Sequence, residues 1–497
     1  MQYNSTRNNT QKVTAQSAMK EGLSREGGLY VPESFPLLTQ MDYNYLINTT
    51  YVKRTAYILN KFLDDFSLEE LENYAVKAYG NNKFGGENPT PLYHYDDRTA
   101  FLELWHGPTC AFKDMALQML PHLLTASVKK TGDDRTVCIL VATSGDTGKA
   151  ALDGFSGVDG AKIIVFYPKG GVSEIQRLQM VTQKGDNVLV CGVDGNFDDA
   201  QTGVKTIFTD EAYNREQNEN GVILSSANSI NWGRLVPQVV YYISAYCDLV
   251  KANKIKLGDT VNVCVPTGNF GNILAAYYAK KMGLPLGKLI CASNRNNVLT
   301  DFINTGVYNR KRDFVLTMSP SMDILISSNL ERYLYDISGK DDGYITTLMD
   351  ALKNDGIYEV TPELKETIKA DFYGGYATEE ETLAQIAKAF SEKGYLMDTH
   401  TAVAASVLEA YRNETGDNNV CVVASTASPY KFNQSVLKAL GVTEETNDEF
   451  ARLETLKQLS GLEIPNSLSE LKTMEKRFTN DCKKEEMIQV VTEFLKQ

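Results

Sequence analysis

The sequence predicts an α/β protein whose parallel sheet is covered by helices on both faces. From about residue 130 onward, short runs rich in β-branched residues alternate with amphipathic stretches of helical length. This alternation is typical of parallel sheets, because each strand must be joined to the next by a long crossover, usually a helix. The composition, with 43% hydrophobic and 23% charged residues, is that of a folded globular chain.

Three regions follow one another along the 497 residues, a length that suggests about two to four domains. Residues 1–92 contain helical patterns such as VKRTAYILNKFL and SLEELENYAVKAY and a glycine-containing turn, REGGLYVP, so we expect a mainly helical N-terminal domain. Residues 93–437 form the α/β core. Residues 438–497 are charged and helical in pattern, and we expect a C-terminal helical extension there.

The core contains a series of predicted strands with helix-forming sequence between them. The strands are TVCILVAT (136–143), KIIVFYP (162–168), NVLVCGV (187–193), GVILSSA (221–227), TVNVCVP (260–266), KLICAS (288–293) and NVCVVAST (419–426). The stretches VSEIQRLQMVTQ and LVPQVVYYISAYCDLVKA are amphipathic and predict helices. In open parallel sheets ligands bind at the carboxyl ends of the strands, so we looked for a site in the loops that follow these runs.

Charge and hydropathy exclude several classes of function. The net charge of −13 argues against a non-specific nucleic-acid binder, and no apolar run is long enough to cross a bilayer. The polar N-terminus lacks the apolar segment of a signal peptide, and the eight cysteines show neither C-x-x-C nor disulfide-framework spacing. We therefore expect a cytoplasmic protein without membrane or nucleic-acid partners. The four histidines show no paired metal-ligand spacing, so we expect no metal site.

The loop after TVNVCVP carries the features of an anion-binding turn. In TGNFGN, Gly268 and Gly271 bracket Asn269 and Phe270, and Asn272 opens a helical stretch. Successive backbone N–H groups at the start of a helix can bind a phosphate. A tight turn is the plainer interpretation of two glycines alone, so this loop indicates a phosphate site only in combination with the other motifs.

The loop after TVCILVAT offers polar side chains at a second strand exit. SGDTGK resembles a phosphate-binding P-loop superficially, but Ala150 stands where such a loop needs a serine or threonine to bind magnesium. We therefore expect no nucleotide triphosphate here. Ser144, Asp146 and Thr147 instead suit a small polar substrate, such as one with an amino-acid carboxylate.

Lys113, in HGPTCAFKDMALQML, stands among mostly small or apolar residues. A lysine is seldom found inside unless it is paired or has a chemical role, although a solvated surface charge is the plainer interpretation of any single lysine. Beside a phosphate-binding loop, its amine could form an imine with an aldehyde cofactor, which points to pyridoxal phosphate (PLP). Thr426, at the end of NVCVVAST, adds a hydroxyl, which alone would be an ordinary helix cap.

Six motifs in order resemble those of threonine synthases, members of the fold type II, tryptophan-synthase-β-like family of PLP-dependent enzymes. They are GPTCAFKD, TSGDTGKAA, SANSINWGRL, PTGNFGN, MDTHTAVA and STASPYKF. The resemblance extends from about residue 25 to at least Phe432, and the long N-terminal region and the NSINW segment favour the longer form found in bacteria and fungi. It implies two parallel-sheet α/β domains with the cofactor between them, and an additional mainly helical N-terminal domain.

The resemblance also implies an activity and roles for single residues. The activity is that of a carbon–oxygen lyase acting on phosphates, which converts O-phospho-L-homoserine and water to L-threonine and phosphate in the last step of threonine biosynthesis. Lys113 carries the cofactor as a Schiff base and serves as acid and base, and Thr426 faces the pyridine nitrogen. The cofactor phosphate is bound by Gly268, Asn269, Phe270, Gly271 and Asn272. The weaker substrate-binding candidates are Ser144, Asp146, Thr147, Asn228, Ser229, Asn231, Arg234 and Lys431.

The sequence offers three candidate cations for the leaving phosphate, and it does not decide between a monomer and a homodimer. The candidates are Lys169, Arg234 and Lys431, and for each of them a surface charge is an equally good interpretation. The chain also departs from the family pattern near one of them. Ser428 stands in place of a histidine, and Thr399 stands in place of a proline next to His400.

The sequence is also compatible with two alternatives of different classes. A serine or threonine dehydratase or a cysteine synthase would have the same fold, but these enzymes usually carry S-x-G-N-x-G, where this chain has Asp146 in place of the amide. A catalytically silent homologue that binds a phosphorylated small molecule is the second alternative. Retention of Lys113, the glycine–asparagine loop and Thr426 together argues against it.

Overall fold

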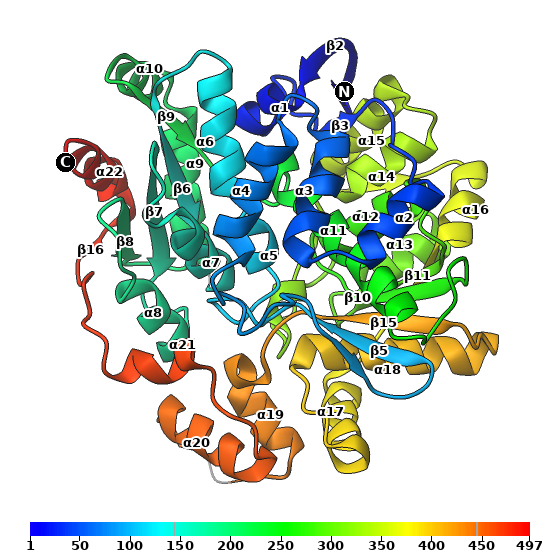
Figure 1. Cartoon of the computed structure of the whole chain (residues 1–497). Helices are drawn as coiled ribbons and strands as arrows, with labels where there is room; N and C mark the ends of the chain where they lie inside the picture. The colour runs from blue at the N-terminus through cyan, green and yellow to red at the C-terminus, as the bar shows by residue number, and fades with distance from the viewer. Residues whose placement is uncertain (144, 444–445) are drawn as a thin grey trace.

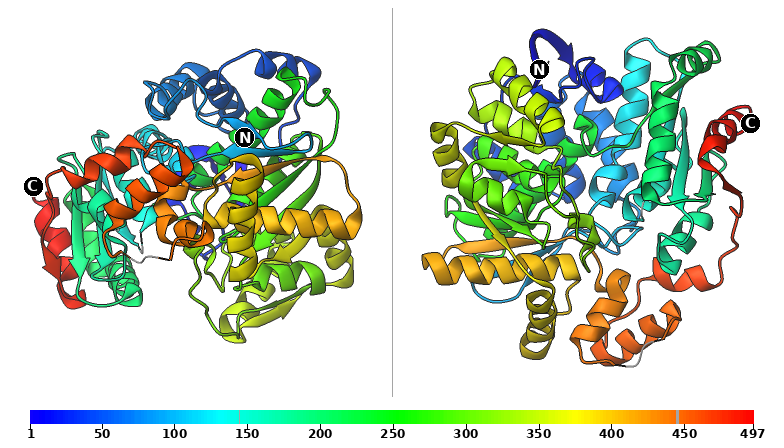
Figure 2. Two further views of the ribbon diagram at one scale, coloured as in Figure 1. Left: turned by 90° about the horizontal axis from the view of Figure 1, so that it is seen from below. Right: turned by 180° about the vertical axis from the view of Figure 1, so that it is seen from behind.

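The computed structural model describes residues 1–143, 145–443 and 446–497. Two covered sheets lie beside each other, the helices of the N-terminal region pack near the larger sheet, and the C-terminal segment runs past the smaller sheet (Figures 1 and 2). Within these residues, no helix combines the length and the apolar character needed to span a bilayer.

The larger sheet has six strands in the order β14-β11-β10-β15-β5-β4. Neighbouring strands are parallel except for β4 and β5, which form an antiparallel pair at one edge. The strands β10, β11 and β15 are buried almost throughout, as expected for a parallel sheet that is covered on both faces. The strands are Leu92–His94 (β4), Thr99–Glu103 (β5), Val261–Pro266 (β10), Leu286–Ser293 (β11), Phe372–Tyr376 (β14) and Val420–Ser425 (β15).

The smaller sheet has five parallel strands in the order β16-β8-β7-β6-β9. Its central strand β7 is apolar and buried over most of its length, which fits its place between two neighbours. The strands are Thr136–Ala142 (β6), Ala161–Pro168 (β7), Val188–Val193 (β8), Val222–Ser225 (β9) and Asp481–Cys482 (β16). All seven strands expected from the sequence are therefore present, four in this sheet and three in the larger one.

The core helices cover the two sheets, and α11 is buried along nearly its whole length. A short antiparallel pair, β12 (Val307–Asn309) and β13 (Ile357–Glu359), lies outside the two sheets. The helices are Asp114–Leu117 (α5), Leu120–Lys130 (α6), Asp146–Phe155 (α7), Glu174–Val181 (α8), Phe197–Thr209 (α9), Glu211–Glu219 (α10), Trp232–Lys251 (α11), Gly271–Lys281 (α12), Val298–Thr305 (α13), Leu330–Ile337 (α14), Asp342–Asn354 (α15), Pro362–Asp371 (α16), Glu379–Lys393 (α17) and Thr399–Thr415 (α18). Helices α8 and α11 correspond to the two amphipathic stretches named above.

The N-terminal region contains the expected helices and also a small antiparallel sheet, β2-β1-β3. The strands are Gln2–Ser5 (β1), Asn8–Thr14 (β2) and Tyr30–Pro32 (β3), and the helices are Ala15–Glu21 (α1), Gln40–Ile47 (α2), Tyr51–Phe62 (α3) and Leu68–Tyr79 (α4). The polar sequences of β1 and β2 give no strand pattern. Their stability comes from tertiary contacts, because the fully buried Tyr3 packs edge-on against Trp232 and Phe62 packs against the same indole.

The C-terminal segment contains several helices and also supplies an edge strand. After α19 (Asn433–Ala439), α20 (Glu449–Ser460) and α21 (Asn466–Ser469), the chain adds β16 in parallel to β8 and ends in α22 (Met487–Leu495). Figure 1 shows this segment in orange and red, running from below the two sheets to the outer side of the smaller one. The two residues of β16 are too few to produce a strand pattern in the sequence.

Candidate active site

A cavity of about 780 Å³ lies between the two sheets. Its walls come from the carboxyl ends of β6 and β9 in the smaller sheet and of β10 and β15 in the larger one. This is the place where open parallel sheets bind ligands. Of the predicted site residues, Lys113, Thr147, Asn228, Ser229, Arg234, Thr426 and the whole of the loop 268–272 line it. Ser144 lies outside the described residues.

Lys113 stands at the start of the short helix α5, where the preceding residues are bound to the end of β15. The Phe112 N–H donates to the Thr426 carbonyl (2.8 Å), and the Ser428 N–H donates to the Cys110 carbonyl (3.0 Å). The Lys113 side chain is half-buried and its Nζ lies 3.3 Å from the Ser321 Oγ. These backbone hydrogen bonds thus fix the main chain next to Lys113, whose side chain lines the cavity.

The surroundings of Lys113 favour its uncharged form. Burial lowers the pKa of its amine, Asp146 and Asp114 oppose this shift, and Lys431 and Arg234 reinforce it, with a lowered pKa as the result. A larger fraction of the amine is therefore uncharged at neutral pH than for a lysine in water. An uncharged amine is what a nucleophile or a general base requires.

The loop between β10 and α12 forms a cradle, residues 268–272, that can hold an anion. Among the described residues, no carbonyl or side chain accepts a hydrogen bond from the N–H groups of this cradle. Phe270 has φ of 64°, a left-handed conformation that turns the backbone at the helix start, and its buried ring is anchored against Tyr333 and Phe372. A Cβ on Gly268 would lie 2.7 Å from the Ser321 carbonyl oxygen, so only glycine fits there.

Asn272 adds a side-chain donor to the same cradle. Its Oδ1 accepts from the Tyr242 hydroxyl, while its buried Nδ2 has no hydrogen-bond partner among the described residues. A buried amide group without a partner costs free energy, which an anionic ligand in the cradle would recover. The cradle therefore fits a phosphate group.

Arg234, on α11, is a second group on the cavity that could bind an anion. One guanidinium nitrogen donates to the Ala227 carbonyl (2.7 Å), and Nε has no partner among the described residues. Burial lowers the pKa of Arg234 to about 10. A buried cation that faces a cavity without a neutralising carboxylate provides the charge that an anionic ligand needs.

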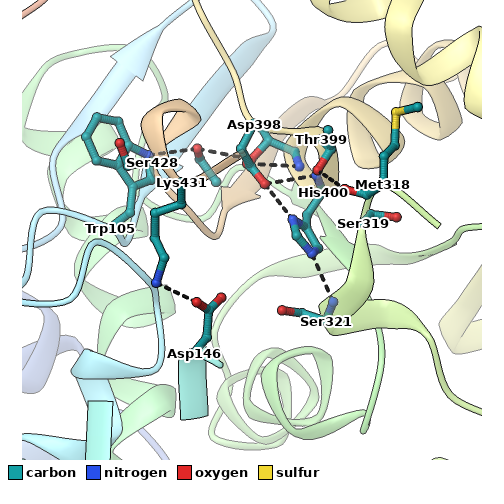
Figure 3. A network of polar contacts seen from close by, with 12 residues as sticks. Trp105, Asp146, Met318, Ser319, Ser321, Asp398, Thr399, His400, Ser428 and Lys431 are labelled. Atoms are coloured by element: carbon teal, nitrogen blue, oxygen red, sulfur yellow. Dashed lines mark hydrogen bonds and ion pairs between the residues drawn. The ribbon is translucent and has the colours of Figure 1, made fainter. Parts of the chain in front are cut away.

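Asp146 and Lys431 do not line the cavity but form a buried ion pair beside it. The Lys431 Nζ lies 2.5 Å from the Asp146 carboxylate and donates to the Thr109 carbonyl (3.0 Å), as Figure 3 shows for the ion pair. Burial raises the pKa of Asp146, but Lys431 and Lys113 outweigh this effect and hold the pKa well below its usual range. Asp146 is therefore a permanent negative charge near Lys113.

Two of the sequence candidates have structural roles away from the cavity. The Asn231 side chain caps α11 by accepting from the Gly233 N–H (2.8 Å) and donates to the Met19 carbonyl (2.9 Å), so it fastens α11 to α1. Lys169, a candidate phosphate ligand, does not line the cavity. Its side chain is exposed and pairs with Asp194 and Asp481 beside β8 and β16.

Sequence reasoning missed Ser321, whose hydroxyl contacts Lys113, and gave His400 no role. Ser321 belongs to a turn, Pro320–Met322, and its N–H donates to the His400 Nε2 (3.2 Å). The histidine Nδ1 in turn contacts Asp398 (2.7 Å), and both side chains are buried (Figure 3). The letters SPSM indicate only a turn, and no sequence signal connects it to Lys113. Among the described residues, no cluster of side chains could hold a metal ion.

Comparisons with known proteins identify the family to which this chain belongs. A family model described as "Pyridoxal-phosphate dependent enzyme" matches residues 84–426, and those described as "Threonine synthase N terminus" and "Threonine synthase, C-terminal" match residues 2–79 and 401–491. The human protein Threonine synthase-like 1 is 42% identical over 91% of this chain and 62% of its own length. This chain thus spans less than two thirds of that relative.

Relatives of similar length are also found. Threonine synthase of Pseudomonas aeruginosa is 36% identical over 88% of this chain and 90% of its own. A crystal structure of PLP-bound threonine synthase from Brucella melitensis is 35% identical, with a TM-score of 0.88, and the match covers 100% of this chain and 98% of that one. The predicted fold and the predicted cofactor, pyridoxal phosphate, are confirmed. With its lysine and phosphate cradle at the same cavity, this chain belongs to the threonine synthase family of PLP-dependent enzymes.

Proposed function

We propose that this chain converts O-phospho-L-homoserine and water to L-threonine and phosphate, as the last step of threonine biosynthesis. The observation that carries the proposal is that one cavity is lined by a lysine amine with a lowered pKa and by two separate features that could each bind an anion, the cradle 268–272 and Arg234. The reaction needs both features, because the cofactor and the substrate each bring a phosphate group.

The residues present fit pyridoxal phosphate. The cradle 268–272 would hold its phosphate, Lys113 would carry it through the amine, and Thr426 would face its pyridine nitrogen. When bound, the cofactor supplies an electron sink for the charge left by proton removal. A hydroxyl at Thr426 stabilises a protonated ring nitrogen less than a carboxylate would, which favours elimination chemistry over transamination.

Lys113 would be the acid and base of the reaction. Once released, its amine can take the proton from the substrate Cα and then from Cβ, and it can return a proton at Cγ. Its lowered pKa increases the share of the amine that is uncharged and able to act as a base, and its flexible stem lets it reach more than one carbon.

Arg234 would bind the leaving phosphate. Of the three candidate cations, Lys169 lies away from the cavity and Lys431 is paired with Asp146. Arg234 lines the cavity and is buried, and no carboxylate of the described residues pairs with it. Thr147, Asn228 and Ser229 line the same cavity and would bind the polar groups at the amino-acid end of the substrate. Ser144 keeps the same proposed role by resemblance alone.

The same proposal extends to the setting of the reaction. All eight cysteines lie within the described residues and are free and buried, which supports a reducing compartment such as the cytoplasm. Either a monomer or a homodimer is compatible with a site whose walls come from one chain.

The test is a product assay with purified protein and PLP. We expect phosphate and threonine to form together from O-phospho-L-homoserine, with no turnover of serine or threonine and none by the Lys113→Ala variant. Release of ammonia and keto acid from serine or threonine would indicate a dehydratase. A yellow protein that binds PLP but turns over none of these amino acids would indicate a silent homologue, and either result contradicts the proposal.

A further inference from the structure

Ser321 is the described residue whose side chain accepts a hydrogen bond from the amine of Lys113. The distance from Nζ to Oγ is 3.3 Å, and both residues line the cavity. The same serine also touches the phosphate cradle, because its carbonyl oxygen is the atom that leaves room only for glycine at position 268. One residue therefore lies against both the reacting amine and the cofactor cradle.

The turn that carries Ser321 is held by buried groups on α18. The Ser321 N–H donates to His400 Nε2, so the ring proton is on Nδ1 and is donated to Asp398. The second oxygen of Asp398 accepts from the Thr401 N–H (3.2 Å) and hydroxyl. His400 and Asp398 are 2% and 0% exposed, so the hydrogen bonds between these two side chains and Thr401 are shielded from water, whereas Ser321 itself is exposed at the cavity.

A second contact fixes the same turn at its beginning. The fully buried Thr399 donates its hydroxyl to the Met318 carbonyl (2.7 Å), as Figure 3 shows. Met318 in turn donates its N–H to Glu379 (3.1 Å). A proline at position 399 could not make the hydroxyl contact, so this tether is specific to the residue that this chain has there.

We propose that Ser321 is a catalytic residue, which holds the free amine of Lys113 in the cavity by accepting a hydrogen bond from it. Asp398, His400 and Thr399 are positioning residues that keep the serine hydroxyl in place. This inference rests on the proposed function, in which Lys113 must return to a fixed place each time its amine is released. Without the acceptor, the amine is free to leave the geometry that proton transfer requires.

The first experiment measures the Lys113 amine in the cofactor-free protein and therefore does not depend on the substrate. Reductive methylation with formaldehyde at a series of pH values, read by mass spectrometry of the Lys113 peptide, gives its apparent pKa. Because the hydrogen bond is stronger from the charged amine, Ser321→Ala should lower this pKa by about one pH unit. Asp114, Asp146, Arg234 and Lys431, the charges that act on the amine, are unchanged in this variant.

Two further variants make the comparison specific. Ser321→Thr keeps the hydroxyl and should restore the wild-type labelling profile. Ser319→Ala removes a hydroxyl in the same turn that bonds to Asn294 and Thr317 instead of Lys113, and should leave the profile unchanged. If Ser321→Ala does not fold, Ser321→Cys replaces it with a weaker acceptor of similar size. A wild-type profile in Ser321→Ala, or an equal shift in Ser319→Ala, overturns the inference.

The second experiment uses the PLP-loaded enzyme. Ser321→Ala should lower kcat by about tenfold or more and change KM by less than about threefold, because the lost contact acts on the catalytic amine. Thr399→Val should lower kcat in the same direction and by less, and Thr399→Ser should restore it. A Ser321→Ala enzyme with reduced binding of substrate and an unchanged kcat contradicts the inference. If no protein turns over phosphohomoserine, the proposed function fails while the labelling result still decides the role of Ser321.

Discussion

Replacing Lys431 by methionine tests the buried ion pair beside the site. The Lys431 side chain is fully buried with its ammonium 2.5 Å from Asp146, whose side chain is only 7% exposed. Methionine keeps most of the volume and removes the charge, so the carboxylate loses its nearest cation. Removing one partner of a buried pair lowers stability by about 3–5 kcal/mol, whereas an exposed pair contributes about 1 kcal/mol or less. We expect a loss of about 3 kcal/mol or more in Lys431→Met.

Urea denaturation at neutral pH, followed by circular dichroism, measures this loss as the difference in free energy of unfolding. Asp146→Asn and the double variant complete a cycle, in which removal of both charges should be less harmful than the sum by about 2 kcal/mol or more. A loss below about 1 kcal/mol in Lys431→Met, or additive effects in the double variant, would refute the reasoning.

The loss of stability in Lys431→Met should also depend on pH, in a direction that follows from the pKa of Asp146. In the wild type, the pKa of Asp146 is depressed, so its contribution to stability is present above the unfolded-state pKa and is lost as the pH falls towards the lower folded-state value. In Lys431→Met, the charge that most lowers the pKa of Asp146 is removed while burial remains, so we expect this pKa to lie higher than in the wild type. The carboxyl then takes up a proton as the pH is lowered, and the difference in stability between the two proteins should shrink.

Three further changes test other parts of the site. Gly268→Ala brings a Cβ to 2.7 Å from the Ser321 carbonyl oxygen. Spectral titration should therefore show that PLP binding is weakened by about tenfold or more. An unchanged affinity for PLP would contradict the close packing of the cradle. Arg234→Met removes a buried cation that has no carboxylate partner among the described residues. We expect kcat/KM in the phosphate-release assay to fall by about 10²–10³-fold, while the thermal midpoint of unfolding stays the same or rises. A large drop in that midpoint would count against the anion site. Burial raises the pKa of Asp114 to about 7 from 3.8, so the folded chain keeps a proton that the unfolded chain loses. The free energy of unfolding, from urea curves at each pH, should therefore fall by about 1.4 kcal/mol per pH unit between about pH 4 and 7 relative to Asp114→Asn, and parallel pH profiles would contradict this.

The strands of the two sheets were predictable where they are long and β-branched. β6 and β10 are buried on both faces, so their sequences TVCILVA and VNVCVP are almost entirely apolar, with Thr136 and Asn262 as the polar exceptions. β14 escaped prediction because FYGGY contains two glycines, which weaken strand propensity. Its Gly374 is required by packing, since a Cβ there would lie 3.0 Å from the Ile303 side chain. This requirement exists only once α13 lies against the sheet.

The candidate site was predictable where chemistry is local in sequence. The cradle 268–272 shows its glycines and its helix start in one short segment, and its positive φ falls on Phe270, which no residue preference would indicate. The contacts of Ser321 are with residues far away in the sequence: Lys113 is 208 positions away and His400 is 79 positions away. The role of Lys431 could not be predicted either, because the sequence does not show which carboxylate a lysine side chain will pair with.

Borohydride reduction of the PLP-loaded protein tests the central claim most directly, because it fixes the cofactor to the amine that carries it. Digestion and mass spectrometry then identify the modified peptide. The account predicts a phosphopyridoxyl group on Lys113 and on no other lysine in wild-type protein, and none in Lys113→Ala. A label on Lys149 or Lys431 in place of Lys113, or a Lys113→Ala protein that still forms threonine at the wild-type rate, would contradict it.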